Sequence, residues 1–107
     1  MSETLRQVQS LVPAGDYIVS RHGFRELAND GISAEDMIAG VMAAVLVEDY
    51  PDSRKEPSVL TLQSDRDGPV HVMWGVPKAT GRPAILVTAY RPDPRRWSAD
   101  FMQRRPR

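Results

Sequence analysis

The chain has 107 residues, enough for one domain, and its 41% hydrophobic and 26% charged residues are typical of a globular protein. Its 14 basic side chains balance 14 acidic ones, and the lack of Cys excludes disulfides, thiolate metal ligands and cysteine nucleophiles. No apolar run approaches the roughly 18 residues of a membrane span, and the N-terminus lacks a signal-peptide pattern, so we expect a cytoplasmic protein with no membrane partner.

The first 15 residues have the pattern of a helix and a linker. Ser2 can cap a helix over residues 1–12, and Pro13-Ala14-Gly15 ends it. Residues 17–19 then read as a short strand or as an extended entry into a single domain, which we place at residues 16–97.

Two more helices are expected before residue 50. Ser20 can cap a helix that continues to Asn29. Ser33 can cap another, whose apolar residues recur at helical spacing, so we predict that it continues to about Val47. The apolar stripe of this last helix comprises Met37, Ile38, Val41, Met42 and Val45.

The second half of the chain has the pattern of strands. Short β-branched and aromatic runs cover residues 59–63, 70–76 and 84–90, and short turns separate them. Loops this short join antiparallel neighbours, because a parallel return needs a dozen or more residues. We therefore predict an α+β fold in which N-terminal helices pack on an antiparallel meander of three to four strands.

Pairing of the last two strands predicts which side chains share a face. If the loop over residues 77–82 closes symmetrically, paired residues have numbers that sum to 159, and His71 faces Thr88. One face then gathers the polar His71, Thr88 and Tyr90. The other face is apolar and is predicted to pack under the helices, with Val70, Val72, Trp74, Ile85, Val87 and Ala89.

The basic residues concentrate at the C-terminal end. From Arg91 onward there are six Arg against two Asp, a local charge of +4, so the first 90 residues carry −4. A basic end can hold a polyanion, but no Lys or Arg stripe elsewhere supports it. We expect residues 98–107 to form a solvated basic tail.

The two His residues are the side chains that titrate near neutrality without special help. His22 lies in the first turn of a predicted helix with Arg25 three positions later, and His71 lies on a predicted strand. A His beside an Arg suits acid–base catalysis on a phosphate. The ordinary alternatives are a surface ion pair for His22 and a structural hydrogen bond from His71 to a Tyr hydroxyl. No metal-ligand spacing, phosphate loop or dinucleotide motif is present, so we expect no metal and no cofactor.

Several short motifs occur in an order that resembles the domain-of-unknown-function 4258 family. The resemblance covers residues 17–97, and its motifs are YIVSRHG, DGISAED, EDYP, His71-Val72, TAYRPD and Trp97. The layout of that family is similar to RelE-type ribonuclease toxins and to barnase-like and colicin-like ribonucleases. The resemblance implies metal-free RNA cleavage, with His22, His71, Thr88 and Tyr90 on matching positions.

One position departs from the family pattern. The family usually has Arg four residues after its first His, where this chain has Glu26, and Arg25 stands one place earlier. A shift of one residue rotates a helical side chain by about 100°. Arg25 therefore either reaches the same site from another angle, or the phosphate-holding role is absent.

These observations lead to a hypothesis of a small, toxin-like ribonuclease with RNA and an antitoxin-like protein as partners. The 2′-hydroxyl would attack the adjacent phosphate, His22 and His71 would share the base and acid roles, Arg25 would stabilise the developing charge, and Tyr90 would orient or protonate. The alternative is a non-catalytic module that binds a protein through the same face or around Trp97 and Phe101, which the zero net charge and Glu26 favour. A third alternative is a scaffold that self-associates through a sheet edge.

Overall fold

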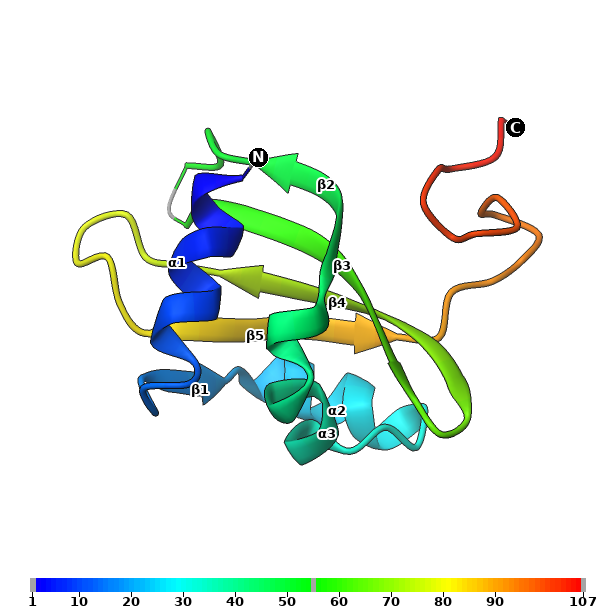
Figure 1. The fold of residues 1–107 in the computed structure, drawn as a ribbon, viewed down its shortest axis with the longest axis horizontal. Helices are drawn as coiled ribbons and strands as arrows, with labels where there is room; N and C mark the ends of the chain where they lie inside the picture. The colour runs from blue at the N-terminus through cyan, green and yellow to red at the C-terminus, as the bar shows by residue number, and fades with distance from the viewer. Residues whose placement is uncertain (1, 55, 107) are drawn as a thin grey trace.

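The computed structural model describes residues 2–54 and 56–106 and has the predicted α+β architecture (Figure 1). Its helical elements are α1 (Glu3–Leu11), α2 (Arg21–Asn29), α3 (Ala34–Ala39) and the 3-10 turn η1 (Val41–Ala43). Its strands are β1 (Tyr17–Val19), β2 (Val45–Tyr50), β3 (Ser58–Asp65), β4 (Gly68–Gly75) and β5 (Ala84–Tyr90). None of the helices in the described residues is long and apolar enough to cross a membrane.

The three α-helices begin where the sequence predicts, because each has a serine N-cap. The hydroxyl oxygens of Ser2, Ser20 and Ser33 accept hydrogen bonds from backbone N–H groups three residues later, at 2.9–3.2 Å. Each cap satisfies one of the N–H groups that a helix leaves unpaired in its first turn.

The third helix ends far earlier than predicted. α3 stops at Ala39, η1 follows, and residues 45–50 form β2 instead of helix. Gly40 is a poor helix former, and the β-branched Val45 and Val47 suit a strand that can pair with β3. The pairing of residues 45–50 with β3 therefore prevails over the helical spacing of the apolar residues.

The sheet has five strands in the order β1-β5-β4-β3-β2. The strands from β2 to β5 form an antiparallel meander, as predicted, but β1 adds a parallel edge to β5 and makes the sheet mixed. The α2, α3 and β2–β4 segments form the long connection between these parallel strands, which is why loop lengths alone did not predict the pair.

The predicted register of β4 and β5 is wrong by two residues at one end and by one at the other. His71 pairs with Tyr90, and a β-bulge after Met73 brings Trp74 opposite Leu86. Tyr90 stays on the predicted face because a shift of two residues preserves sidedness, whereas a shift of one reverses it. The core face of β5 therefore carries Ala84, Leu86 and Ala89 instead of Ile85 and Val87.

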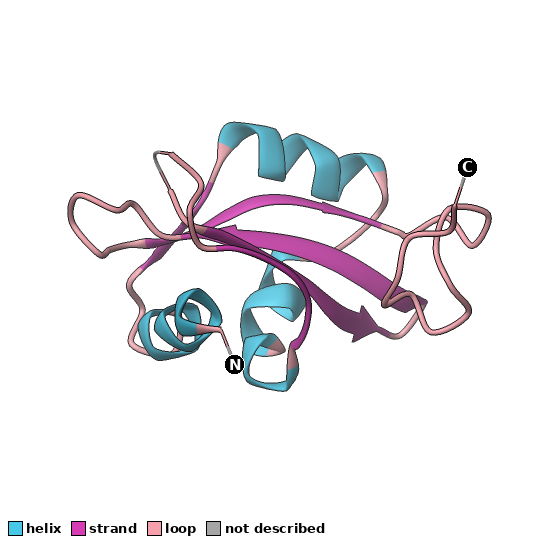
Figure 2. Ribbon diagram, turned by 90° about the horizontal axis from the view of Figure 1, so that it is seen from above, coloured by secondary structure: helices cyan, strands magenta, loops and turns pink. Residues whose placement is uncertain are grey.

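α1 and α3 cover one face of the sheet, and α2 lies on its other side (Figure 2). Trp74 is a fully buried member of the core that lies under α1 and α3. Its indole N–H donates to the Gln63 side chain at 2.9 Å, and Gln63 donates to the Met37 carbonyl at 2.8 Å. This chain of bonds ties α3 to the middle of the sheet.

α2 approaches β5 closely because Gly23 has no side chain. A Cβ at position 23 would lie 2.7 Å from the Leu86 carbonyl oxygen and 3.1 Å from that of Val87. The Ser20 hydroxyl donates to the same Val87 carbonyl at 2.9 Å, which holds the start of α2 against the strand.

Gly23→Ala is expected to lower the free energy of unfolding by about 1–3 kcal/mol, because the new methyl group collides with backbone. Ala is the better helix former by about 1 kcal/mol, so a stabilised variant in urea denaturation would contradict the close approach. Arg21→Ala, an exposed position of the same helix, is the control and should change stability by less than about 0.5 kcal/mol.

Candidate functional site

The predicted site residues are divided between two elements of the fold. His22 and Arg25 are exposed on α2. His71 is fully buried on β4, while Thr88 and Tyr90 are half-buried on β5. No hydrogen bond or aromatic contact within the described residues joins His22 to His71 or Tyr90. The structure thus brings together His71 and Tyr90 and leaves His22 and Arg25 outside that contact.

His71 and Tyr90 face each other on adjacent strands and are hydrogen-bonded. The His71 Nδ1 lies 3.2 Å from the Tyr90 hydroxyl oxygen, and its Nε2 lies 2.9 Å from the Phe101 carbonyl oxygen. A carbonyl only accepts, so Nε2 carries the proton and, in the neutral ring, Nδ1 accepts from the phenol. Both ring nitrogens are therefore used.

The C-terminal segment (residues 91–106, orange to red in Figure 1) contacts His71 through the Trp97 ring and the Phe101 carbonyl. The Trp97 ring packs edge-on against the imidazole at 4.4 Å between centroids and is only 4% exposed. Backbone bonds from Ser98 to Gln103 and from Arg105 to Arg96 fold the segment into a loop. Most described side chains of the predicted tail, residues 98–106, are exposed, but the segment is folded back on the sheet by these bonds and by the buried Trp97 ring.

An ion pair joins this segment to β2. The Arg104 guanidinium donates to both oxygens of Glu48, at 2.8 and 3.1 Å, and also stacks 4.7 Å from the centre of the Trp97 ring. The Tyr50 hydroxyl donates to Glu48 at 2.5 Å. Arg104 is mostly exposed, and the Glu48 side chain keeps 23% of its surface. We call the group formed by His71, Trp97, Glu48, Tyr50, Tyr90 and Arg104 the His71 cluster, and the last four of these residues its rim.

The surroundings shift the pKa values of these groups. The bonds from Arg104 hold the pKa of Glu48 below its usual value, so the carboxylate is ionised. Burial lowers the pKa of His71, although the Phe101 carbonyl and Glu48 act in the opposite direction, and the neutral imidazole is favoured. Burial also raises the pKa of Tyr90, which keeps its proton.

The lowered pKa of His71 predicts a loss of stability in weak acid. Below the unfolded-state pKa, about 6.5, the unfolded chain binds a proton that the folded chain resists, so the free energy of unfolding falls as pH drops from 7 toward the folded pKa. The slope is at most about 1.4 kcal/mol per pH unit. We expect urea denaturation at pH 7 and 5.5 to show this loss.

His71→Gln should flatten that pH dependence, whereas His22→Gln should retain it. A direct check is the NMR titration of the His71 ring protons, which should move at a pH below 6.5. A His71 ring that titrates above 6.5 would contradict the assignment, whatever the stability of the variants.

Sequence reasoning missed the residues that complete this cluster. Arg104 was assigned to a free tail, and Trp97 and Phe101 to a binding flank. Two large aromatic side chains inside a short basic stretch were the available signal, because such residues are usually packed. No feature of the sequence predicts the contact between Glu48 and Arg104, because the two residues are 56 positions apart.

The rim combines a carboxylate, a guanidinium and a phenol bonded to an imidazole. These groups can accept a proton, hold an anion and donate a proton. Within residues 2–54 and 56–106, no three His, Asp or Glu side chains group in a way that could hold a metal ion.

Comparison with known proteins identifies a family for this chain. The family model described as Domain of unknown function (DUF4258) matches residues 19–91, a range that contains α2, α3 and the strands β2 to β5 in full and only the last residue of β1. No curated protein and no solved structure matches this chain.

Proposed function

This chain belongs to the family described as Domain of unknown function (DUF4258), whose description assigns no activity, so we propose its function from its own side chains. We propose that it is a RelE-like, metal-independent ribonuclease that acts at the rim of the His71 cluster. The observation that carries the proposal is that the Glu48–Arg104 ion pair meets the bonded pair of His71 and Tyr90 at Trp97, whose ring contacts both His71 and Arg104. A proton acceptor, an anion-binding group and a proton donor stand together there.

The reaction proposed is transesterification within the RNA chain. The 2′-oxygen attacks the neighbouring phosphorus, its proton passes to Glu48, the bond from phosphorus to the 5′-oxygen breaks, and Tyr90 gives a proton to that oxygen. The products are a 2′,3′-cyclic phosphate and a 5′-hydroxyl end. This step balances without water, an oxidant or a metal ion.

Arg104 has a second role in the proposal, as the group that exchanges one anion for another. A guanidinium binds carboxylate and phosphate with the same two-pronged geometry. When the scissile phosphate binds Arg104, Glu48 loses its cationic partner and becomes a better base. Arg104 then stabilises the charge that develops on the phosphate oxygens.

His71 is a positioning residue in this scheme. It has no exposed surface, so it does not touch the RNA, but its Nδ1 accepts a hydrogen bond from the Tyr90 hydroxyl and holds that group in place. His22 and Arg25 stay candidates for contact with the RNA from α2, because both are exposed.

The test is cleavage of an RNA oligonucleotide in the presence of a metal chelator. We expect products with a cyclic phosphate end from RNA and none from the 2′-O-methyl analogue, which lacks the attacking hydroxyl. His22→Ala should cleave within a few-fold of the wild-type rate. Loss of cleavage in His22→Ala would instead return the acid or base role to α2, and no cleavage by the wild type would reject the proposal.

One observation favours a second candidate, a non-catalytic binding module. His71 is sealed, and every buried side-chain nitrogen and oxygen in the described residues has a hydrogen-bond partner. A site this satisfied also suits a purely structural cluster. Failure of RNA cleavage together with capture of a purified antitoxin-like protein would support this second function.

A further inference from the structure

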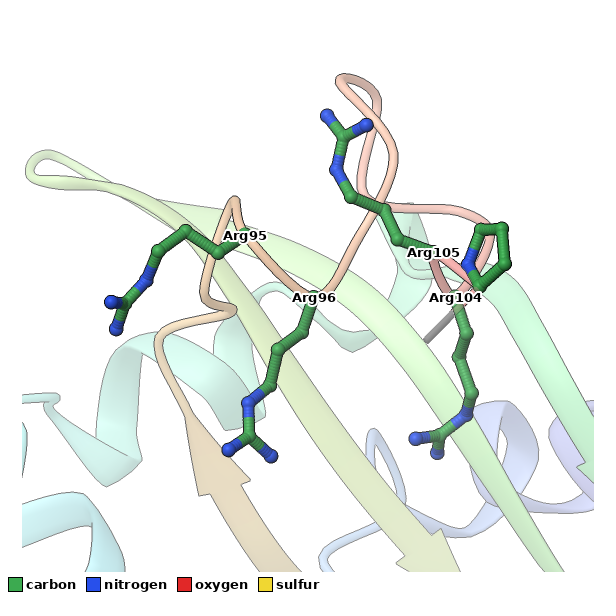
Figure 3. Close-up of a pocket in the computed structure, with 5 residues that line it drawn as sticks. Arg95, Arg96, Arg104 and Arg105 are labelled. Carbon is green, nitrogen blue, oxygen red and sulfur yellow. The ribbon is translucent and has the colours of Figure 1, made fainter.

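A pocket of about 500 Å³ lies on the C-terminal segment, next to the rim. It is lined by Arg95, Arg96, Arg104, Arg105 and Pro106, so four of its five lining residues are arginines (Figure 3). The pocket shares Arg104 with the rim, which places it directly beside the groups assigned to RNA cleavage.

The positive charge of this pocket is only partly neutralised within the protein. Arg95 pairs with Asp93 and Arg104 with Glu48. Arg105 donates to the Pro94 carbonyl at 2.9 Å, which uses an N–H group but supplies no negative charge. The Arg96 side chain has no hydrogen bond or ion pair with residues 2–54 or 56–106. Arg96 and Arg105 therefore carry positive charge that no ion pair within the described residues neutralises.

The directions of the side chains indicate the shape of that anion. In Figure 3 the Arg96 and Arg104 guanidinium groups extend to the same side, Arg105 extends to the opposite side and Arg95 points away from both. Groups that fan out in this way do not converge on one small ion. They suit a chain of phosphates, each of which meets a different guanidinium.

We infer that the arginine pocket is a subsite for the RNA backbone, in which Arg96 and Arg105 bind phosphates that flank the one held at Arg104. The inference rests on the proposed function, and it specifies where the RNA chain lies on the protein. A phosphodiester chain crosses the pocket, and its neighbouring phosphate reaches the rim. Binding here depends on salt, because each contact releases a condensed counterion.

The experiment uses a fluorescent 2′-O-methyl RNA oligonucleotide, which binds without being cleaved, and fluorescence anisotropy across a range of salt concentrations. The variant is Arg96→Gln with Arg105→Gln, which leaves the Arg95 and Arg104 ion pairs intact. We expect Kd to rise roughly tenfold at low salt, and the slope of log Kd against log salt to fall by about 1.4, the value for two lost phosphate contacts on a single strand.

The control removes the same charge elsewhere, with Arg66→Gln and Lys78→Gln, which are exposed in the turns around β4. An equal loss of affinity in both double variants would overturn the inference, because it would reflect net charge alone. Equal competition by poly-glutamate or by anionic phosphatidylserine vesicles would also overturn it, since the pocket would then select no phosphate chain of RNA.

The two proposals fail separately in this design. If the wild type does not cleave RNA but Arg96→Gln with Arg105→Gln weakens binding as expected, the subsite stands and the ribonuclease proposal fails. If the wild type cleaves RNA and the double variant binds the analogue as tightly as the wild type, the subsite fails alone.

Discussion

Glu48→Gln is expected to lower the rate of RNA cleavage by about 100-fold or more, the usual contribution of a general base. Gln keeps the size and one acceptor oxygen of Glu48 but cannot take the proton of the 2′-hydroxyl. Binding should persist, because Arg104 loses a competing carboxylate and stays free for phosphate. The measurement is a single-turnover rate at saturating RNA, with the Kd of the 2′-O-methyl analogue measured alongside.

Glu35→Gln provides the matched control, because it makes the same change of charge at an exposed position of α3. Its rate should stay within about twofold of the wild type. If Glu48→Gln also stays in that range while the protein remains folded, Glu48 is not the base and the assignment of the rim is wrong.

Trp74→Ala is expected to lower the free energy of unfolding by roughly 3–5 kcal/mol. The indole is fully buried between β4 and the helices α1 and α3, and its removal leaves a cavity. It also leaves the Gln63 side-chain oxygen without the bond from the indole N–H. Since small domains are stable by only about 5–15 kcal/mol, the loss is a large share of the total.

Urea denaturation followed by circular dichroism measures this change. Phe24→Ala is the contrasting variant, because its ring is 64% exposed and should matter by less than about 0.5 kcal/mol. A loss below 1 kcal/mol for Trp74→Ala would show that the core does not depend on this side chain as the packing indicates.

The sequence predicted local structure best where short-range chemistry decides it. Ser2, Ser20 and Ser33 are caps because a hydroxyl can reach an N–H three residues away, whatever the rest of the fold does. The end of α3 was mispredicted because Val45 fits both a helical stripe and a strand. The pairing of Val45 with Leu62 on β3 favours the strand, and the local pattern around Val45 does not reveal that pairing.

Long-range geometry was predicted only in part. The side chains of His71 and Tyr90 share a face in both the predicted and the observed register, because the error at that end is an even number of residues. The β-bulge beside Trp74 reversed the faces of Ile85 and Leu86, and no residue pattern in the chain marks it. The contacts that Arg104 makes with Glu48 were not predicted either, because they depend on how the C-terminal loop returns to the sheet.

The parallel pairing of β1 with β5 has a consequence for how the chain folds. Tyr17 pairs with Ala84, so β1 cannot pair until β5, the last strand, has been synthesised on the ribosome. The earlier hairpins, β2 with β3 and β3 with β4, join near neighbours and can zip first, while closure of the long loop to β1 costs more entropy. We therefore expect the docking of β1 on β5 to be a late and slow step of folding.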